Sequence, residues 1–174
     1  QLLIKENENL RKDELLVSSE LKILQNQINP HFFFNTVNMI YQQAILEKAD
    51  ITVEMIEKMT ECMRYTLSQN TRISNLAMEL NFMRNYLYIQ NRRFEGRIEF
   101  ILEEERELPN IKIPAMIIEP LVDNAIKHGL SNTESGGLVV IHVECKDDQV
   151  IIHVSDNGKG MSAVALEQLI MNQY

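Results

Sequence analysis

Residues 119–129 read EPLVDNAIKHG, and this stretch decides how the rest of the chain is interpreted. We predict a helix over residues 115–129 that ends at the glycine. The spacing places four side chains on one face of that helix: Pro120, Asn124, Lys127 and His128. The Asn124 amide oxygen suits Mg²⁺, which arrives carrying phosphates, and Lys127 adds a positive charge one turn along. The plain alternative is the surface face of an ordinary packed helix.

A second motif follows further along the chain. Residues 138–144 and 149–155 are rich in β-forming side chains and predict a hairpin, and the loop after them reads DNGKG from Asp156. Gly158 and Gly160 would let the backbone approach a ligand closely. The Asp156 carboxylate can accept a hydrogen bond from an exocyclic amine such as that of adenine. Taken alone, the pattern D-x-G-x-G also describes many tight turns.

The pattern around these two motifs predicts an α/β sandwich. After Gly96, the apolar residues Ile98, Phe100 and Leu102 occupy alternate positions, which indicates a half-buried strand. A further helix is expected over residues 162–171. The order strand, helix, two strands, loop and helix is typical of a sheet with helices on one face.

The front of the chain is predicted to be helical. A leucine or valine recurs every seven residues, at Leu3, Leu10, Val17 and Leu24. This repeat predicts a parallel coiled coil over residues 1–28, with a single amphipathic helix on its own core as the alternative. Pro30 interrupts the repeat, and Asn29 as N-cap with Pro30 in the first turn suits the start of a new helix.

Two apolar stripes on either side of residues 47–50 predict a helical hairpin. Two copies of such a hairpin would bury their apolar faces as a four-helix bundle, so we expect a homodimer. Polar residues 68–75 separate the hairpin from another helix over residues 76–94. The expected fold class is therefore α+β in three parts: a coiled coil over 1–28, a dimerising hairpin over 29–75, and an α/β domain over 76–174.

His31 follows the bend that Pro30 introduces, where the helix must open to solvent. A neutral imidazole is a good nucleophile toward a phosphoryl group near physiological pH. Asn35 is four residues further on, on the same helical face, and could fix the ring by a hydrogen bond. A histidine beside three phenylalanines is more often a packed core residue, and that alternative stays open.

Composition excludes several other classes of protein. With 45% hydrophobic and 24% charged residues, a chain of 174 residues can bury a core. The net charge of −8, from 17 basic and 25 acidic side chains, argues against nucleic acid as a partner. Uninterrupted apolar runs are far shorter than the roughly 20 residues of a membrane-spanning helix. Because the chain begins at Gln1 without an initiator Met, we expect a piece of a longer protein, so that any membrane anchor would lie outside this piece.

The two motifs together resemble a known family. A helix with N-A-x-K-H-G, a β hairpin and then D-N-G-x-G-M resembles the ATP-binding domain of the GHKL superfamily, the Bergerat fold of histidine kinases, gyrase, Hsp90 and MutL. Upstream, residues 24–32 read LQNQINPHF and residues 86–94 read YLYIQNRRF. With these stretches, the chain resembles a sensor histidine kinase of the LytS/YesM type.

The resemblance implies a role for each candidate residue. His31 would be the autophosphorylated residue, beside Asn35, and Asn124 would hold Mg²⁺. Lys127 and His128 would flank the phosphates of ATP. Adenine would be read by Asp156, in a loop that is shaped by Gly158 and Gly160.

The resemblance also implies a setting for the chain. It would be the cytoplasmic portion of a bacterial membrane protein, with the sensor region on the N-terminal side. The phosphoryl group would pass to an Asp on a separate cytosolic response regulator.

Three departures from the family pattern bear on the function. The glycine-rich lid and the last strands of the family do not follow the DNGKG loop before Tyr174, so we expect weak nucleotide affinity and poor autokinase activity from this fragment. Pro120 occupies the position where gyrase-like ATPases have a water-activating Glu, which favours transfer to a side chain over transfer to water. Phe32 occupies the position after His31 where many histidine kinases carry an acidic base, and Glu119 is an open candidate for that base.

A non-catalytic nucleotide-sensing dimer and an ATPase remain as alternatives.

Overall fold

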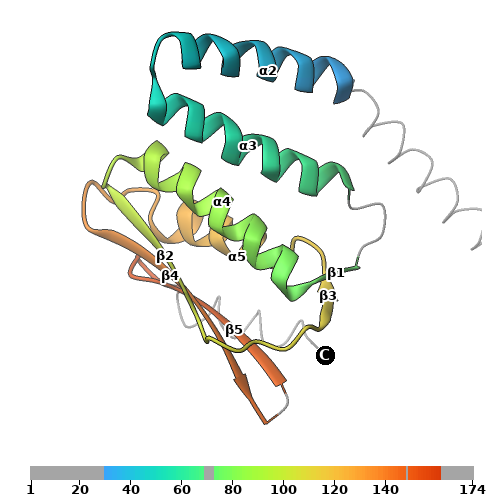
Figure 1. Ribbon diagram of the computed structural model, residues 1–174. Helices are drawn as coiled ribbons and strands as arrows, with labels where there is room; N and C mark the ends of the chain where they lie inside the picture. Colours follow the sequence, from blue (N-terminus) through green and yellow to red (C-terminus); the bar gives the residue numbers. More distant parts are fainter. Residues whose placement is uncertain (1–29, 69–72, 148, 162–174) are drawn as a thin grey trace, which may run out of the picture. The chain divides into compact units, whose positions relative to one another are not determined.

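A computed structural model describes residues 30–68, 73–147 and 149–161 of the chain (Figure 1). The coiled coil predicted over 1–28 and the helix predicted over 162–171 lie outside these residues. The chain forms two compact units, Gln1–Val53 and Glu54–Tyr174, which divide within one helix. The predicted domain boundaries at residues 28 and 75 stay predictions.

The described part of the first unit contains helix α2 (Pro30–Leu46) and the start of helix α3 (Asp50–Ser68). Pro30 is the first residue of α2, as expected, because the first turn of a helix needs no backbone N–H from it. A tight turn joins the two helices, with Lys48 in the left-handed region (φ 56°) and the Ala49 N–H donating to the Ala44 carbonyl at 2.9 Å. The predicted pair of helices around residues 47–50 is therefore confirmed.

The second unit is built on a three-stranded sheet in the order β2-β4-β5. Its strands are β2 (Ile98–Glu104), β4 (Gly137–Lys146) and β5 (Gln149–Asp156). Strand β2 runs parallel to β4, and β4 pairs antiparallel with β5, with Lys146 opposite Gln149. The strand predicted after Gly96 and the predicted hairpin are both confirmed.

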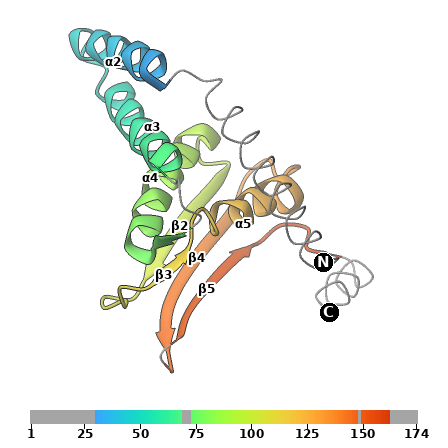
Figure 2. The same cartoon turned by 90° about the vertical axis from the view of Figure 1, so that its right-hand side faces the viewer.

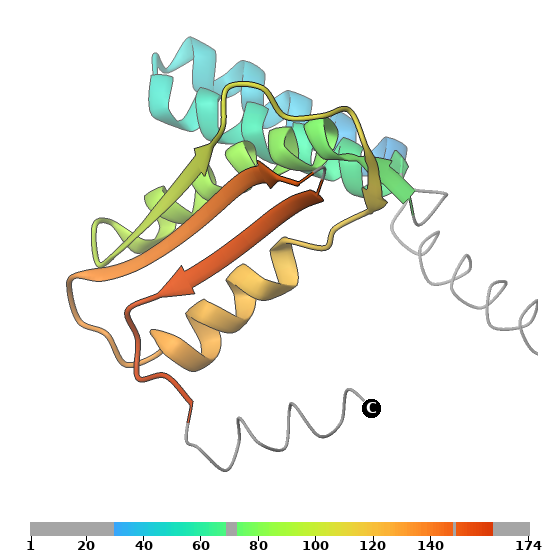
Figure 3. The same cartoon turned by 90° about the horizontal axis from the view of Figure 1, so that it is seen from below.

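Helices cover one face of this sheet (Figures 1 and 3). They are α4 (Leu76–Phe94), α5 (Glu119–Asn124) and the π-helical turn η1 (Ala125–Gly129) that continues α5. The core between the layers is made by alternate strand residues and by the inner faces of the helices, including Leu80, Met83, Leu87, Val122, Val139, Ile141 and Val143. This two-layer arrangement is the predicted α/β sandwich, and the fold class is α+β.

A small second sheet was not predicted from the sequence. Strand β1 (Ile73–Asn75) pairs antiparallel with β3 (Lys112–Pro114), with Ser74 opposite Ile113 (Figure 2). Asn75 then caps α4, since its side-chain oxygen accepts the Met78 N–H at 2.8 Å. The ladder therefore ties the segment before α4 to the segment before α5, where the sequence indicated only connections.

The helix predicted over residues 115–129 is wrong at its start and in its last turn. Met116 lies in the left-handed region (φ 57°), which an α-helix of L-residues does not accommodate, so α5 begins at Glu119. Pro120 lies in the first turn, where proline is tolerated. From Ala125 the hydrogen bonds become π-helical, with the Leu130 N–H donating to the Ala125 carbonyl at 2.9 Å.

Candidate functional site

The two sequence motifs of the α/β domain meet in space at three residues, Gly129, Asp156 and Gly158. The DNGKG loop lies against the last turn of η1, where the Lys159 N–H donates to the Gly129 carbonyl at 3.2 Å. A Cβ atom at Gly158 would lie 2.4 Å from the Gly129 backbone. Glycine is therefore required at position 158, because only backbone without a side chain can approach so closely.

The Asp156 side chain shapes this loop and remains exposed. Its Oδ1 accepts the Gly158 N–H at 2.9 Å, which closes a turn of the loop. Alternation along β5 puts Asp156 on the same face as Val154, which packs on the core beneath the helices. Within the described residues Oδ2 makes no hydrogen bond, so one carboxylate oxygen can accept from a ligand.

Asn157 holds the loop to the start of β4. Its side-chain oxygen accepts the Leu138 N–H at 2.8 Å, and its amide donates to the Gly136 carbonyl at 2.9 Å. Sequence reasoning treated Asn157 only as a turn residue. The signal that could have revealed its role is the tendency of asparagine to replace backbone hydrogen-bonding groups beside turns.

The exposed face of α5 and η1 carries Asn124, Lys127 and His128, as predicted. Lys127 does not present an isolated charge, because its Nζ pairs with Asp123 Oδ2 at 2.7 Å. Asp123 Oδ1 also accepts the Tyr86 O–H at 2.8 Å. The lysine and the tyrosine hold the pKa of Asp123 below its ordinary value, while burial and Asp123 raise the pKa of Tyr86.

The Asn124 side chain is exposed and makes no hydrogen bond to any described residue. Its amide oxygen is therefore open to a hard cation, and Mg²⁺ characteristically takes few protein ligands and several oxygens from phosphate and water. Within the described residues, no group of three or more His, Cys, Asp or Glu side chains could hold a metal ion. A single exposed amide oxygen fits an ion that takes its other ligands from phosphate and water.

Glu119 lies at the start of α5 and is half-buried. Burial, and then the carboxylates of Asp123 and Glu79, raise the pKa of Glu119 above its ordinary value. A carboxyl group with a raised pKa is a suitable proton acceptor in phosphoryl transfer. Its candidacy as the base for His31 therefore stays open as a prediction.

His31 lies in the first turn of α2, and its side chain is exposed. The amide nitrogen of Asn35 lies 3.2 Å from one imidazole nitrogen and 3.3 Å from the other. Phe32 beside it is 70% exposed. This exposure does not fit the alternative of a packed core histidine, and the roles of His31 and Asn35 stay predictions.

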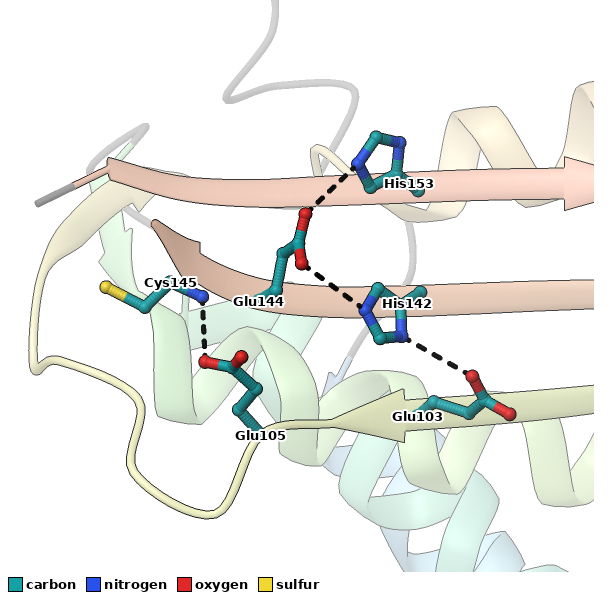
Figure 4. Close-up of polar contacts among 6 residues, drawn as sticks. All are labelled: Glu103, Glu105, His142, Glu144, Cys145 and His153. Atoms are coloured by element: carbon teal, nitrogen blue, oxygen red, sulfur yellow. Dashed lines mark hydrogen bonds and ion pairs between the residues drawn. The ribbon is translucent and has the colours of Figure 1, made fainter. Parts of the chain in front are cut away.

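A row of charged and imidazole side chains crosses the opposite face of the sheet (Figure 4). It consists of Glu103 on β2, His142 and Glu144 on β4, and His153 on β5. Their ion-pair distances are 3.4–3.8 Å, and His142 and His153 are cross-strand partners. Since Asp156 lies on the helix-covered face, this row is not part of the site around the DNGKG loop.

Comparison with known proteins gives one class for both parts of the chain. Residues 19–98 match the family described as "Histidine kinase". Residues 110–174 match the family described as "Histidine kinase-, DNA gyrase B-, and HSP90-like ATPase". The chain belongs to the sensor histidine kinases.

Three bacterial relatives illustrate the membership. Sensor histidine kinase YesM of Bacillus subtilis (strain 168) is 33% identical over 92% of this chain and 28% of its own length. Sensor histidine kinase BtsS of Escherichia coli (strain K12) is 31% identical over 84% of this chain and 26% of its own length. Sensor protein kinase HptS of Staphylococcus aureus (strain USA300) is 34% identical over 85% of this chain and 28% of its own length. The chain thus spans about a quarter of the length of these curated relatives.

A solved structure of histidine kinase ThkA in complex with response regulator protein TrrA is also similar. It is 16% identical, and the match covers 94% of this chain and 53% of that chain with a TM-score of 0.40. A score this low supports no conclusion about fold or partner.

In the described part of the chain, no helix is both long and apolar enough to span a membrane.

Proposed function

We propose that this chain is the kinase core of a two-component sensor and transfers the γ-phosphoryl group of ATP to His31. One observation carries the proposal: the helix with Asn124 and the loop with Asp156 meet at Gly129. Asn124 and Asp156 are both exposed, and Asp156 lies against Gly129, which ends the helical segment that carries Asn124. The family membership of both parts of the chain supports the assignment.

In this proposal the α/β domain binds ATP. Asp156 accepts a hydrogen bond from the adenine amine, and Gly158 and Gly160 keep the loop free of side chains that would block the base. Lys127 and His128 lie beside the phosphates. Asn124 would hold Mg²⁺ through its amide oxygen, and the ion, when bound, would supply positive charge beside the phosphates.

The imidazole of His31 is the acceptor. A ring nitrogen forms a bond to the γ-phosphorus while the bond from that phosphorus to the bridging oxygen breaks, and ADP leaves. The other ring nitrogen then loses its proton, for which Glu119 is a candidate acceptor. Asn35 orients the ring, since its amide lies within hydrogen-bonding distance of either nitrogen.

The proposal includes a homodimer, a response regulator and a membrane sensor. The first unit exposes large apolar side chains, namely Phe32, Met39, Ile40, Ile45, Leu46 and Ile51. Exposed apolar clusters of this kind mark protein interfaces, and a second copy forming a four-helix bundle would cover them. The relatives are named as sensors, which supports phosphoryl transfer to a response-regulator Asp and a cytoplasmic placement below a membrane sensor.

The test uses the full-length protein, incubated with Mg²⁺ and ATP labelled on the γ-phosphate. We expect an acid-labile label on the wild type and none on His31→Gln, while a fluorescent ATP analogue binds both equally. Label that persists in His31→Gln would contradict the acceptor. Nucleotide binding without any label would identify a sensing scaffold, and steady phosphate release that survives His31→Gln would identify an ATPase.

A further inference from the structure

Helix α4 carries a fully buried carboxylate, Glu79, that is 0% exposed. Its Oε2 accepts the Tyr65 O–H at 2.5 Å and the Met116 N–H at 3.0 Å. Its Oε1 accepts the Ile118 N–H at 3.3 Å. Both oxygens are thus engaged, by groups from two different segments of the chain.

The first of these segments leads directly into α5. Ile118 is the N-cap residue of α5 and offers no side-chain oxygen to cap it. Met116 has a left-handed backbone (φ 57°), a conformation that persists in a non-glycine residue only where its surroundings enforce it. The Glu79 carboxylate supplies that constraint, because buried N–H groups need acceptors. The start of the helix that carries Asn124 is therefore set by Glu79.

The second segment is the C-terminal half of α3. Tyr65 is buried, and its ring packs against Phe82 of α4 with the ring centroids 4.9 Å apart and the planes tilted by 32°. Its hydroxyl reaches Glu79, so one carboxylate joins α3 to the start of α5. Helix α3 follows α2, which carries His31.

Other polar contacts also join α3 to α4, and two side-chain pairs among them provide a comparison. Asn85 donates to Glu61 at 2.6 Å, and the Tyr88 hydroxyl donates to Glu54. Within the described residues neither pair continues to α5. The contact through Tyr65 and Glu79 therefore differs from these two pairs by reaching the segment that starts α5, the helix that carries Asn124.

We propose that Glu79 is a positioning residue that couples α3 to the nucleotide site through Tyr65. This inference rests on the proposed function, since it assigns a structural route between the helical hairpin and ATP binding. A shift of α3 moves the Tyr65 hydroxyl, and the shared carboxylate passes that shift to the start of α5. By reciprocity, nucleotide binding must then also act on α3, and we expect it to stabilise this helix.

The experiment measures amide hydrogen exchange in the full-length protein, with and without the non-hydrolysable analogue β,γ-imido-ATP and Mg²⁺. In the wild type we expect the nucleotide to slow exchange at residues 119–129 and 156–160, and also in α3 at residues 61–68. In Tyr65→Phe, which keeps the ring packing, the slowing at the site should remain. The slowing in α3 should fall by about fivefold or more, as is typical of a lost coupling between sites.

Tyr88→Phe is the matched control, because it removes a Tyr–Glu hydrogen bond between the same two helices. It should retain the slowing in both regions. Glu79→Gln replaces one acceptor oxygen by a donor, so the nucleotide should no longer slow exchange in α3 of this variant. This second variant tests the proposal if Tyr65→Phe fails to fold. In Tyr65→Phe the half-saturating ATP concentration for His31 phosphorylation should stay unchanged while the rate at saturating ATP falls.

Each outcome decides between the two proposals. A nucleotide response at 119–129 and 156–160 without any response in wild-type α3 would overturn the coupling and leave the proposed function intact. An α3 response retained in both Tyr65→Phe and Glu79→Gln would overturn it as well. The absence of any response at the site in the wild type would instead count against the proposed function.

Discussion

The carboxylate of Asp156 lies directly beside Gly129, so that a Cβ atom at Gly129 would come within 2.4 Å of Asp156 Oδ1. The two residues belong to different elements, one ending η1 and the other ending β5. Their contact fixes the DNGKG loop against the helix that carries Asn124. The glycine predicted only as a helix stop is therefore also a spacer within the candidate site.

Gly129→Ala should displace the Asp156 carboxylate and weaken nucleotide binding by about tenfold or more. Overpacking of this kind typically costs about 1–3 kcal/mol, so the domain should remain folded. Titration with a fluorescent ATP analogue and thermal unfolding measure the two effects. Ser131→Ala, at an exposed position just after η1, should leave both unchanged. Unaltered affinity in a folded Gly129→Ala protein would show that the Asp156 position does not matter for binding.

Asp156→Asn should preserve the loop but change the recognition of the base. Its oxygen can still accept the Gly158 N–H, while the new amide donor would face the adenine amine. The affinity for ATP should fall by about tenfold to a hundredfold, since a mismatched polar contact costs about 1–3 kcal/mol. Inosine triphosphate carries an acceptor in place of the amine, so its affinity should fall less or rise. A variant that keeps the wild-type preference for ATP over inosine triphosphate would refute the adenine contact.

Asn35→Ala should slow phosphorylation of His31 without changing ATP binding. In the proposed function the Asn35 amide, which lies within hydrogen-bonding distance of the imidazole, positions the ring, and loss of such positioning typically lowers rates by about tenfold or more. Single-turnover labelling at saturating and subsaturating ATP separates the rate from the affinity. Asn38→Ala, an exposed change on the same helix, is the control. Equal rates for the wild type and Asn35→Ala would remove Asn35 from the proposed mechanism.

Glu119→Gln should make the folded protein more stable near neutral pH. The pKa of Glu119 is raised on folding, by burial first, so the folded state binds its proton more tightly than the unfolded chain. Stability linked to this group is therefore present at low pH and is lost as pH rises through the raised pKa. The variant never carries that charge, so its advantage in chemical denaturation should shrink toward about pH 4. Glu134→Gln, at an exposed position, should show no such trend.

Elements with strong periodicity were predictable from the sequence. The helix expected over 76–94 coincides with α4, and the alternating residues of β2 and the β4–β5 hairpin fall where expected. These segments are long, and each has one buried face, so the pattern of apolar residues carries the information. The exposed face with Asn124, Lys127 and His128 followed from the same periodicity.

Features that depend on distant partners were not predictable. Glu79 looks like a surface charge on an amphipathic helix, yet its backbone partners lie 37 and 39 residues further along the chain. Strands β1 and β3 are too short to show a period. The pairing of Lys127 with Asp123 could have been anticipated from their spacing of four residues, which is a common ion-pair distance on helices.

The π-helical turn over Ala125–Gly129 also affects how this region should be engineered. Its wider winding turns the chain through a smaller angle per residue than an α-helix does. A helical-wheel drawing of residues 119–129 therefore misplaces the angles of the positions after Ala125, although it still puts Lys127 and His128 on the exposed face. Libraries that vary the exposed side of Lys127 and His128 should be designed from the three-dimensional coordinates of the turn.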